Sequence, residues 1–404
     1  MWRALYTEKS DGIITLKDHL NFLAMVFCFW LAIYIYAPIF GVYLQHVGFS
    51  YSAIGIILGS YGVTQVLLRL PLGILSDYLQ HIRKHLLVGG FLMALASNLL
   101  FVFFDSFIMV LLARLLVGGT ASAWVMATVL YSYYFSAGRS SKAMGILQFI
   151  TVGTQFLGMG ISGYLVYLAG WSFPFWVGAI ASLAGIYFAM NIKDIQVEKV
   201  QIINVGIKQH IKEISNIPNL FKLTFISLIA HAILFITIFG FTPILASSLG
   251  IPEKSFAWLI SAFFLPHMIA SMVFIFYEFT SRVNQIMLQV CYFITAVCLV
   301  LIIGAESLFT LSIYHAGLGL SLGFIFPILL SEVVRISPAN LKMSAMGFYQ
   351  SFYALGILMG PLIAGVVAEQ FGLKEVFLFT GILSFLVTIG TLWTFKRSTY
   401  ENMA

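Results

Sequence analysis

The 404-residue chain is 61% hydrophobic and only 9% charged, and its mean hydropathy is +1.00. A soluble domain carries about 25% charged residues because its surface faces water, so this composition excludes a soluble globule and predicts a protein largely surrounded by lipid. The three cysteines, Cys28, Cys291 and Cys298, lie in apolar runs. Their number and placement argue against a disulfide framework, and no Cys or His cluster predicts a metal site.

Apolar runs long enough to cross a bilayer recur along the whole chain. A membrane-spanning helix needs about 20 residues, and twelve runs meet this requirement. They occupy residues 20–45, 52–79, 85–104, 107–134, 143–168, 173–192, 220–247, 255–277, 284–304, 307–333, 343–368 and 375–395. The first run is too long and uninterrupted for a cleaved signal peptide, so we expect a retained helix.

The basic residues are distributed unevenly between the two sets of loops. If the N-terminus is cytoplasmic, 17 of the 21 Lys and Arg residues fall on cytoplasmic segments and only Lys254 and Lys374 on external loops. Cytoplasmic loops of membrane proteins carry such an excess, so we expect a plasma-membrane protein with both termini in the cytoplasm. The net charge of +6 then reflects topology, and we predict no nucleic-acid partner.

A polar segment, residues 193–219, separates the predicted helices of residues 1–192 from those of residues 220–404. Its isoleucines are spaced for one face of a helix, with lysines on the other side. It is either a helix lying on the inner membrane surface or a plain linker. Both alternatives predict two domains of six helices each.

The two halves share a sequence repeat. Residues 142–170 align without gaps with residues 344–372, at an offset of 202, and eight of the 29 positions are identical. The fifth helix therefore corresponds to the eleventh, and the halves repeat in parallel. Parallel six-helix repeats are a known transporter architecture with the substrate site between them. We predict an all-α integral membrane protein of two pseudo-symmetric six-helix bundles.

The charged stretch after the second predicted helix carries a motif. Gly73, Leu75 and Asp77 form G-x-L-x-D, and the basic pair Arg83 and Lys84 follows. This resembles the signature of the major facilitator superfamily between its second and third helices, although the basic residue directly after the aspartate and the glycine two positions further on are absent. The resemblance implies a secondary transporter in which Gly73, Asp77, Arg83 and Lys84 form a latch between the bundles on the cytoplasmic side.

Two arginines lie inside predicted membrane helices. Arg114 and Gly118 form R-x-x-x-G, which resembles the fourth-helix pattern of the same family. A charge within a membrane helix costs a few kcal/mol and marks a functional position by default. Arg114 is either a substrate-pathway residue or a structural clamp on neighbouring carbonyls. Arg69 lies nearer the cytoplasmic end and either joins the pathway or extends its side chain to the membrane surface.

Glycines recur at matching positions of the fifth and eleventh helices. GMGISG, residues 158–163, and GPLIAG, residues 360–365, resemble the G-P-x-x-G-G motif of the antiporter branch of the family, but only the second copy has its proline, Pro361. The motif indicates either antiport or tight helix packing, with packing the preferred use of Gly118, Gly158, Gly163, Gly360 and Gly365.

No acidic residue lies near the middle of a predicted helix, so the carboxylate that often carries a coupling proton is absent. His231, His267 and His315 are central instead, and His315 aligns with Arg114 at an offset of 201. Histidine titrates near neutral pH. Each of the three is therefore either a proton-coupling residue or a neutral histidine that bridges helices.

The charge pattern favours an anionic or neutral polar substrate over a cation, because Arg114 and Arg69 have no buried acid to balance them. Gln65, Gln155 and Gln350 are predicted neutral contacts. We expect a monomeric transporter that binds a small molecule and protons, lies in a lipid bilayer and uses no cofactor or metal. Its predicted function is secondary active transport by alternating access, with export favoured over uptake.

Several alternatives remain open at this level. The chain could be a polyspecific drug exporter or an uptake symporter of the same architecture. It could also be a polytopic membrane enzyme, for which no nucleophile or HExxH motif is present, or a non-transporting receptor.

Overall fold

The computed structural model describes residues 14–75, 83–132, 134–135, 140–193, 212–277, 279–337 and 342–401. These residues form helices joined by short turns, and none of them lies in a β-strand. The first half of the chain contains α2 (Leu16–Tyr34), α3 (Ala37–Val47), α4 (Tyr51–Leu75), α5 (Arg83–Phe103), α6 (Phe107–Ser122), α7 (Trp124–Ser132), α8 (Ser140–Ala169) and α9 (Phe173–Asn191). The second half contains α11 (Leu220–Ile236), η2 (Thr237–Phe241), α12 (Thr242–Ser248), η3 (Glu253–Ser255), α13 (Phe256–Phe276), α14 (Ser281–Ile302), α15 (Leu308–Ile336), α16 (Lys342–Gln370) and α17 (Leu373–Glu401).

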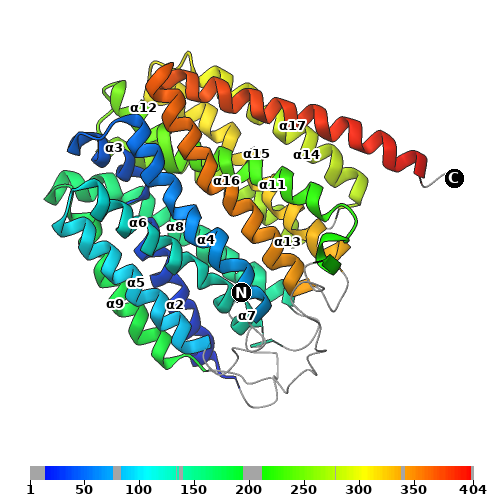
Figure 1. Cartoon of the computed structure of the whole chain (residues 1–404), viewed down its shortest axis with the longest axis horizontal. Coiled ribbons are helices and arrows are strands. Elements are labelled where there is room, and N and C mark those ends of the chain that lie inside the picture. The colour runs from blue at the N-terminus through cyan, green and yellow to red at the C-terminus, as the bar shows by residue number, and fades with distance from the viewer. Residues whose placement is uncertain are drawn as a thin grey trace.

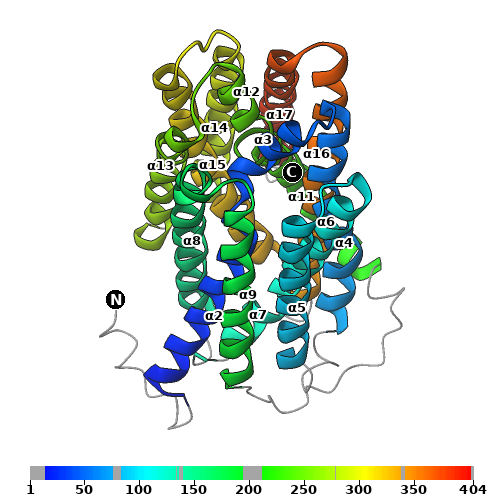
Figure 2. The same ribbon diagram turned by 90° about the vertical axis from the view of Figure 1, so that its left-hand side faces the viewer.

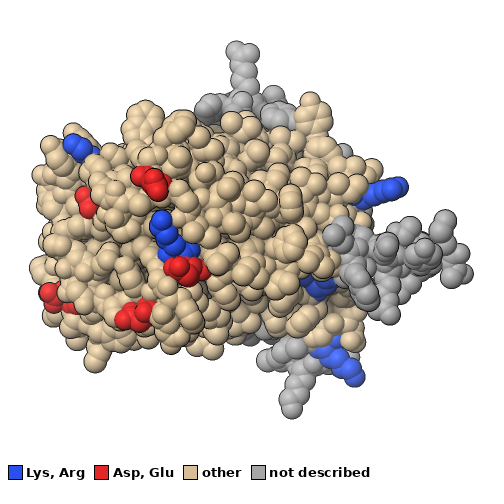
Figure 3. Space-filling view, turned by 90° about the horizontal axis from the view of Figure 1, so that it is seen from above, with Lys and Arg blue, Asp and Glu red and all other residues tan. Residues whose placement is uncertain are grey.

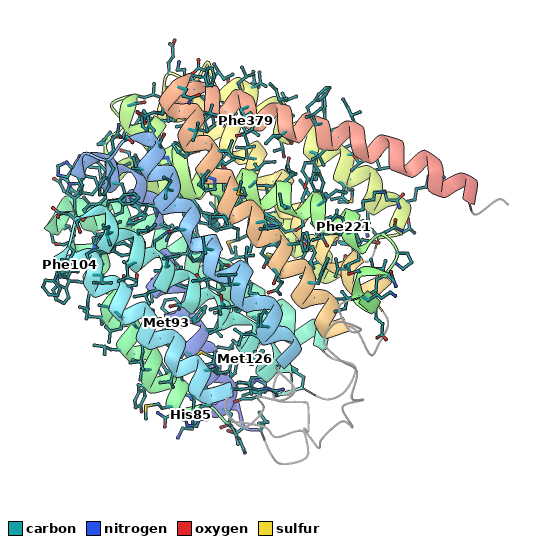
Figure 4. All side chains as sticks on the ribbon, viewed as in Figure 1. His85, Met93, Phe104, Met126, Phe221 and Phe379 are labelled. Carbon is teal, nitrogen blue, oxygen red and sulfur yellow. The ribbon has the colours of Figure 1, made fainter. Side chains whose placement is uncertain are left out.

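Twelve stretches of the described chain are long and apolar enough to cross a membrane, which confirms the twelve predicted spans. Large apolar side chains also cover the outside of the molecule. Phe104 and Phe221, labelled in Figure 4, are 47% and 59% exposed, and Trp258 and Phe309 are more exposed still. So large an apolar surface is stable only against lipid or a partner. The chain is a multi-pass membrane protein.

Three of the twelve spans are interrupted, although the sequence predicts each as one helix. The first is divided into α2 and α3, and the seventh contains the π-helical turn η2 between α11 and α12. Pro38 and Pro243 lie in the first turns of α3 and α12, where proline is tolerated because its missing N–H has no partner there anyway. The fourth span is divided at Ala123, between α6 and α7.

The helices form two bundles that follow the two halves of the chain. In Figure 1, α2, α4, α5, α6, α8 and α9 lie on one side and α11 and α13 to α17 on the other. We call these the N-bundle (residues 14–193) and the C-bundle (residues 212–401). Most of the polar linker lies outside the described residues, and residues 212–215 of it are helical.

The packing repeats between the bundles as the sequence does. In α6, Gly118 lies against the main-chain carbonyl of Tyr61 in α4. In α15, Gly319 lies against the carbonyl of Phe263 in α13. Both glycines allow backbones to touch where a side chain would not fit. Because the two contacts join equivalent positions, the bundles are pseudo-symmetric in packing as well as in sequence.

The bundles meet along two helix pairs, α4 with α16 and α8 with α13. Figure 2 shows α8 beside α13 and α16 beside α4. In α8, Gly163 lies against the main-chain carbonyl of Glu253, and in α16, Gly365 lies against that of Tyr51. Gly365 follows Gly163 by 202 residues in the sequence, and Tyr51 precedes Glu253 by the same number. The two bundle contacts are therefore related by the internal repeat.

These contacts lie at one end of the molecule, which we call the acidic end because Asp105, Glu253, Glu306, Glu369 and Glu375 lie in or beside its connecting loops. The opposite end, where Lys17, Arg83, Lys193, Lys212 and Arg282 lie at helix ends, we call the basic end. On the face drawn in Figure 3, the acidic side chains gather towards one end, with some Lys or Arg side chains among them, and the charged side chains seen towards the other end are Lys and Arg.

Polar contacts also join the bundles at the acidic end. The main-chain N–H of Ser52 donates to Glu369 Oε2 at 3.2 Å. Lys254 Nζ lies 5.2 Å from the centre of the Tyr167 ring. Ser52 and Lys254 are equivalent in the repeat, as are Tyr167 and Glu369. The bundles are thus closed against each other at this end by a matched pair of contacts.

Candidate functional site

Arg114 lies in the middle of α6 and is only 5% exposed. Its guanidinium carbon lies 4.7 Å from the centre of the Tyr61 ring and 5.2 Å from that of Phe40. Its Nε is buried without a hydrogen-bond partner, and no carboxylate of a described residue pairs with the side chain. Cation–π contacts with two rings therefore replace the ion pair that normally accompanies a buried charge.

Arg69 lies in α4 and reaches across to the C-bundle. Its Nη1 donates to the hydroxyl of Tyr353 in α16 at 2.8 Å, and its guanidinium carbon lies 5.3 Å from the centre of that ring. The residue is 4% exposed, and its Nε has no partner. Instead of extending to the membrane surface, Arg69 is a buried contact between the bundles.

Tyr353 connects Arg69 to His231. The Tyr353 and His231 rings are stacked, with centroids 3.7 Å apart and planes 4° from parallel. Nδ1 of His231 lies 2.8 Å from the main-chain carbonyl of Ser227, which can only accept, so Nδ1 carries a hydrogen. Nε2 forms no hydrogen bond within the described part of the chain and is therefore the nitrogen that can take up a further proton.

Aromatic rings from both bundles surround the two arginines. The ring centroids of Tyr34 and Phe239 lie 5.1 Å apart, and those of the stacked pair Tyr61 and Phe235 lie 5.7 Å apart. The N-bundle therefore meets the C-bundle through two ring pairs. Trp30 stacks on Tyr34 at 5.4 Å. Both guanidinium groups lie close enough to Tyr34 and Tyr61 to interact with them electrostatically. We call Trp30, Tyr34, Tyr61, Phe235 and Phe239 the aromatic cluster.

The three predicted histidines have different surroundings. His315 is fully buried, and both its ring nitrogens are used: Nδ1 donates to the Leu311 carbonyl at 2.8 Å, and Nε2 lies 2.9 Å from Thr242 Oγ1. These contacts support the structural alternative for His315. His267 is 7% exposed, and its Nδ1 has no hydrogen-bond partner. Its ring centroid lies 5.9 Å from that of Phe326, and the Phe326 centroid lies 4.7 Å from that of His231.

The predicted glutamines are distributed over three helices. Gln65 in α4 is fully buried, its Nε2 donates to the Tyr61 carbonyl at 2.8 Å, and its Oε1 has no partner. This hydrogen bond to the Tyr61 main chain places Gln65 beside the aromatic cluster. Gln350 in α16 also has an unpartnered, buried Oε1. Gln155 in α8 is half-buried.

The predicted latch is described only in part. Gly73 lies in the last turn of α4, and Arg83 and Lys84 begin α5. Arg83 is fully buried. Asp77 lies outside the described residues, so the pairing of the latch stays a prediction.

The remaining predicted glycines contact neighbouring helices. An added Cβ at Gly158 would lie 3.1 Å from the Leu31 side chain, and one at Gly360 would lie 3.0 Å from Ala232 Cα. The helix continues through Pro361 in α16. These distances agree with a packing use of the glycines.

The acids of the described chain are remote from the two arginines. Asp105, Glu253, Glu306, Glu369 and Glu375 belong to the acidic end, and Asp18, Glu213 and Glu332 lie near helix termini on the other side. Among the described residues no His, Cys, Asp and Glu side chains group as metal ligands would. The cluster between the bundles is therefore cationic and aromatic, and it can bind an anion or a polar molecule with a flat face.

The profile of the Major Facilitator Superfamily matches residues 22–244 and again residues 223–402. The chain belongs to this superfamily. The inner membrane transport protein YajR of Escherichia coli (strain K12) is 28% identical over 373 residues, which cover 90% of this chain and 79% of YajR. The quinolone resistance protein NorA of Staphylococcus aureus (strain MRSA252) is 25% identical over 171 residues, 42% of this chain and 43% of NorA.

Solved structures of the superfamily share the fold. The nucleoside transporter NupG superposes with a TM-score of 0.73 at 16% identity, and the match covers 94% of this chain and all of NupG. With the twelve spans and the internal repeat, this likeness confirms the predicted fold class of two six-helix bundles.

Sequence reasoning missed Tyr353, Tyr61 and Trp30 as members of the site. Aromatic residues make up 16% of the chain, so an aromatic side chain alone is a weak signal. The sequence holds no signal that pairs Tyr353 with Arg69, which lies 284 positions away.

Proposed function

We propose that this superfamily member is a secondary active transporter that moves an anionic or neutral polar small molecule by alternating access. The observation that carries the proposal is the pair Arg69 and Arg114, both buried and neither in an ion pair with a described carboxylate. Arg69 contacts Tyr353 of the C-bundle, and Arg114 lies against Tyr61, whose ring stacks on Phe235 of the C-bundle. Buried unpaired charge is costly, and a substrate that supplies the missing acceptor repays that cost.

The distribution of charge supports an orientation. The basic end is proposed to face the cytoplasm, because cytoplasmic loops usually carry the excess of Lys and Arg, with both termini on that side of the plasma membrane. The closed acidic end then faces outward, so the structure represents a state closed to the outside. A monomer suffices for this mechanism, because both bundles belong to one chain.

Proton coupling through His231 is part of the proposal. Its Nε2 is available, and its ring stacks on the tyrosine that holds Arg69. Protonation of His231 would add a second cation beside Tyr353 and weaken the Arg69 contact by repulsion. The proton and the substrate would in this way act on the same bundle contact.

Export is favoured over uptake by the similarity to a resistance protein. That similarity also supports the second candidate, a polyspecific drug exporter. The carboxylate-free cluster favours anions over the cations that many such exporters accept. No described cluster of acids or metal ligands supports an enzyme.

A thermal-stability screen of the purified protein in detergent tests the proposal. The parent and Arg114→Ala are heated with organic anions, sugars and lipophilic cations. Anions or sugars should raise the unfolding temperature of the parent and not that of the variant. Stabilisation of both proteins by lipophilic cations alone would favour the drug-exporter alternative.

A further inference from the structure

Three buried hydrogen-bond donors in or beside the aromatic cluster have no acceptor. They are Arg69 Nε, Arg114 Nε and Trp30 Nε1, on side chains that are 4%, 5% and 5% exposed. Buried polar groups in native proteins are nearly always hydrogen-bonded, and each exception requires an explanation. The two guanidinium groups both lie close to Tyr34 and Tyr61, and together they match a ligand that offers several acceptor oxygens, as a carboxylate or sulfonate does.

The internal repeat places the charge of this site in the N-bundle. His315 is the C-bundle counterpart of Arg114, and both its nitrogens are occupied by Thr242 and Leu311. The C-bundle thus presents no equivalent free donor at that position. An anionic group is therefore expected to bind between α4 and α6, beside Tyr61.

The rest of the site is built from aromatic faces. The ring pairs Tyr34 with Phe239 and Tyr61 with Phe235 are contacts between the bundles, so any movement that separates the bundles here must part these rings. A planar ring inserted between them would restore a face contact on both sides, since offset and edge-on aromatic pairs are favourable. An aliphatic group of the same size would fill the space without this gain.

Resting on the transport function proposed above, we propose that the substrate class is an aromatic organic anion. Its acidic group binds Arg114, with Arg69 as a further donor, and its ring lies between Tyr34 or Tyr61 of the N-bundle and Phe235 or Phe239 of the C-bundle. Arg69 then exchanges its Tyr353 partner for the ligand.

Calorimetric binding of four matched probes to the purified protein tests this assignment. The probes are 2-naphthoate, its saturated decalin carboxylate, neutral 2-naphthylmethanol and cationic 2-naphthylmethylammonium. We expect 2-naphthoate to bind most tightly, with the saturated anion and the neutral alcohol each about tenfold weaker and the cation without measurable binding. Equal binding of both anions would overturn the aromatic part, and tighter binding of the cation would overturn the charge assignment.

Variants separate the contributions. Arg114→Gln should weaken 2-naphthoate about ten- to a hundredfold, whereas Arg282→Gln, an exposed arginine at the basic end, should leave it unchanged. Phe239→Leu should reduce the preference for 2-naphthoate over the saturated anion and keep the dependence on Arg114. If Arg114→Gln does not fold, Arg114→Lys replaces it and should bind with intermediate affinity. Unchanged affinity in a folded Arg114 variant would contradict the proposal.

Failure of the assignment and failure of the transport function give different results. If the probes bind as expected but are not exchanged across proteoliposome membranes, the ligand class stands and the transport function falls. If a lipophilic cation is exchanged and its exchange does not depend on Arg114, the transport function stands and the ligand class falls.

Discussion

Arg69 of the N-bundle donates a 2.8 Å hydrogen bond to the hydroxyl of Tyr353 in the C-bundle. The Tyr353 ring is stacked on His231 at 3.7 Å. A cation, a phenol and an imidazole thus form one continuous contact across the bundle interface. A ligand that attracts Arg69 and a proton that binds His231 would both weaken the same junction.

Tyr353→Phe is expected to weaken that junction, because it removes the acceptor of Arg69 and leaves another buried donor unpartnered. Hydrogen bonds to charged groups contribute about 1.5–3 kcal/mol, so the unfolding temperature in detergent should fall by several degrees. Tyr349→Phe is the matched control. It removes a hydroxyl that accepts from Ser227 at 2.8 Å and does not touch Arg69. An equal fall of the unfolding temperature in both variants would argue against a specific role for the Arg69 contact.

Gly163→Val is expected to open the acidic end, because the new side chain would collide with the main-chain carbonyl of Glu253. Gly160→Val in the same helix is the control, since an added Cβ there meets nothing within 4 Å. In a background without the native cysteines, a cysteine at Ser52 should react faster with a membrane-impermeant thiol reagent in Gly163→Val than in Gly160→Val. Equal rates would mean that this glycine does not hold the end closed.

Replacing His231 and replacing His315 are expected to change different properties of the protein. His231→Gln should flatten the pH dependence of transport, because the free Nε2 is lost. His315→Gln should lower the unfolding temperature and preserve the pH dependence, because its nitrogens serve Thr242 and Leu311. Transport assays across a pH series measure the first effect and thermal denaturation the second. If pH dependence survives replacement of His231, His267 and His315 together, none of them carries the coupling proton.

The twelve spans and the two-bundle repeat could be predicted because both depend on patterns within the sequence, apolar length and an offset of 202. The site could be predicted only in part. Burial cost identifies Arg69 and Arg114 as unusual, but the sequence does not show whether an ion pair, a carbonyl or a ring receives them. For Arg69 the receiving residue, Tyr353, lies 284 positions away.

The same limit applies to the histidines and to the interrupted helices. His231 and His315 look alike as central residues of apolar helices, and only their partners distinguish them. The turn η2 depends on packing in the seventh span, and Gly240 there is a weak indication of it among the 34 glycines of the chain.

The two ends are expected to face opposite sides of the membrane. A cysteine at Lys254, at the acidic end, should be labelled by an impermeant reagent added to intact cells. A cysteine at Lys212, at the basic end, should be labelled only after the membrane is made permeable. Labelling of Lys212 from outside would reverse the orientation and make the closed end cytoplasmic.

The central claim is that Arg114 binds an anion that the protein carries across the membrane. Counterflow of labelled 2-naphthoate into proteoliposomes preloaded with the unlabelled compound tests it most directly, with the parent, Arg114→Gln and Arg282→Gln compared at equal reconstitution. The parent and Arg282→Gln are predicted to accumulate label transiently, and Arg114→Gln is predicted to remain at the level of empty liposomes. Equal accumulation by all three proteins, or none by the parent, would contradict the claim.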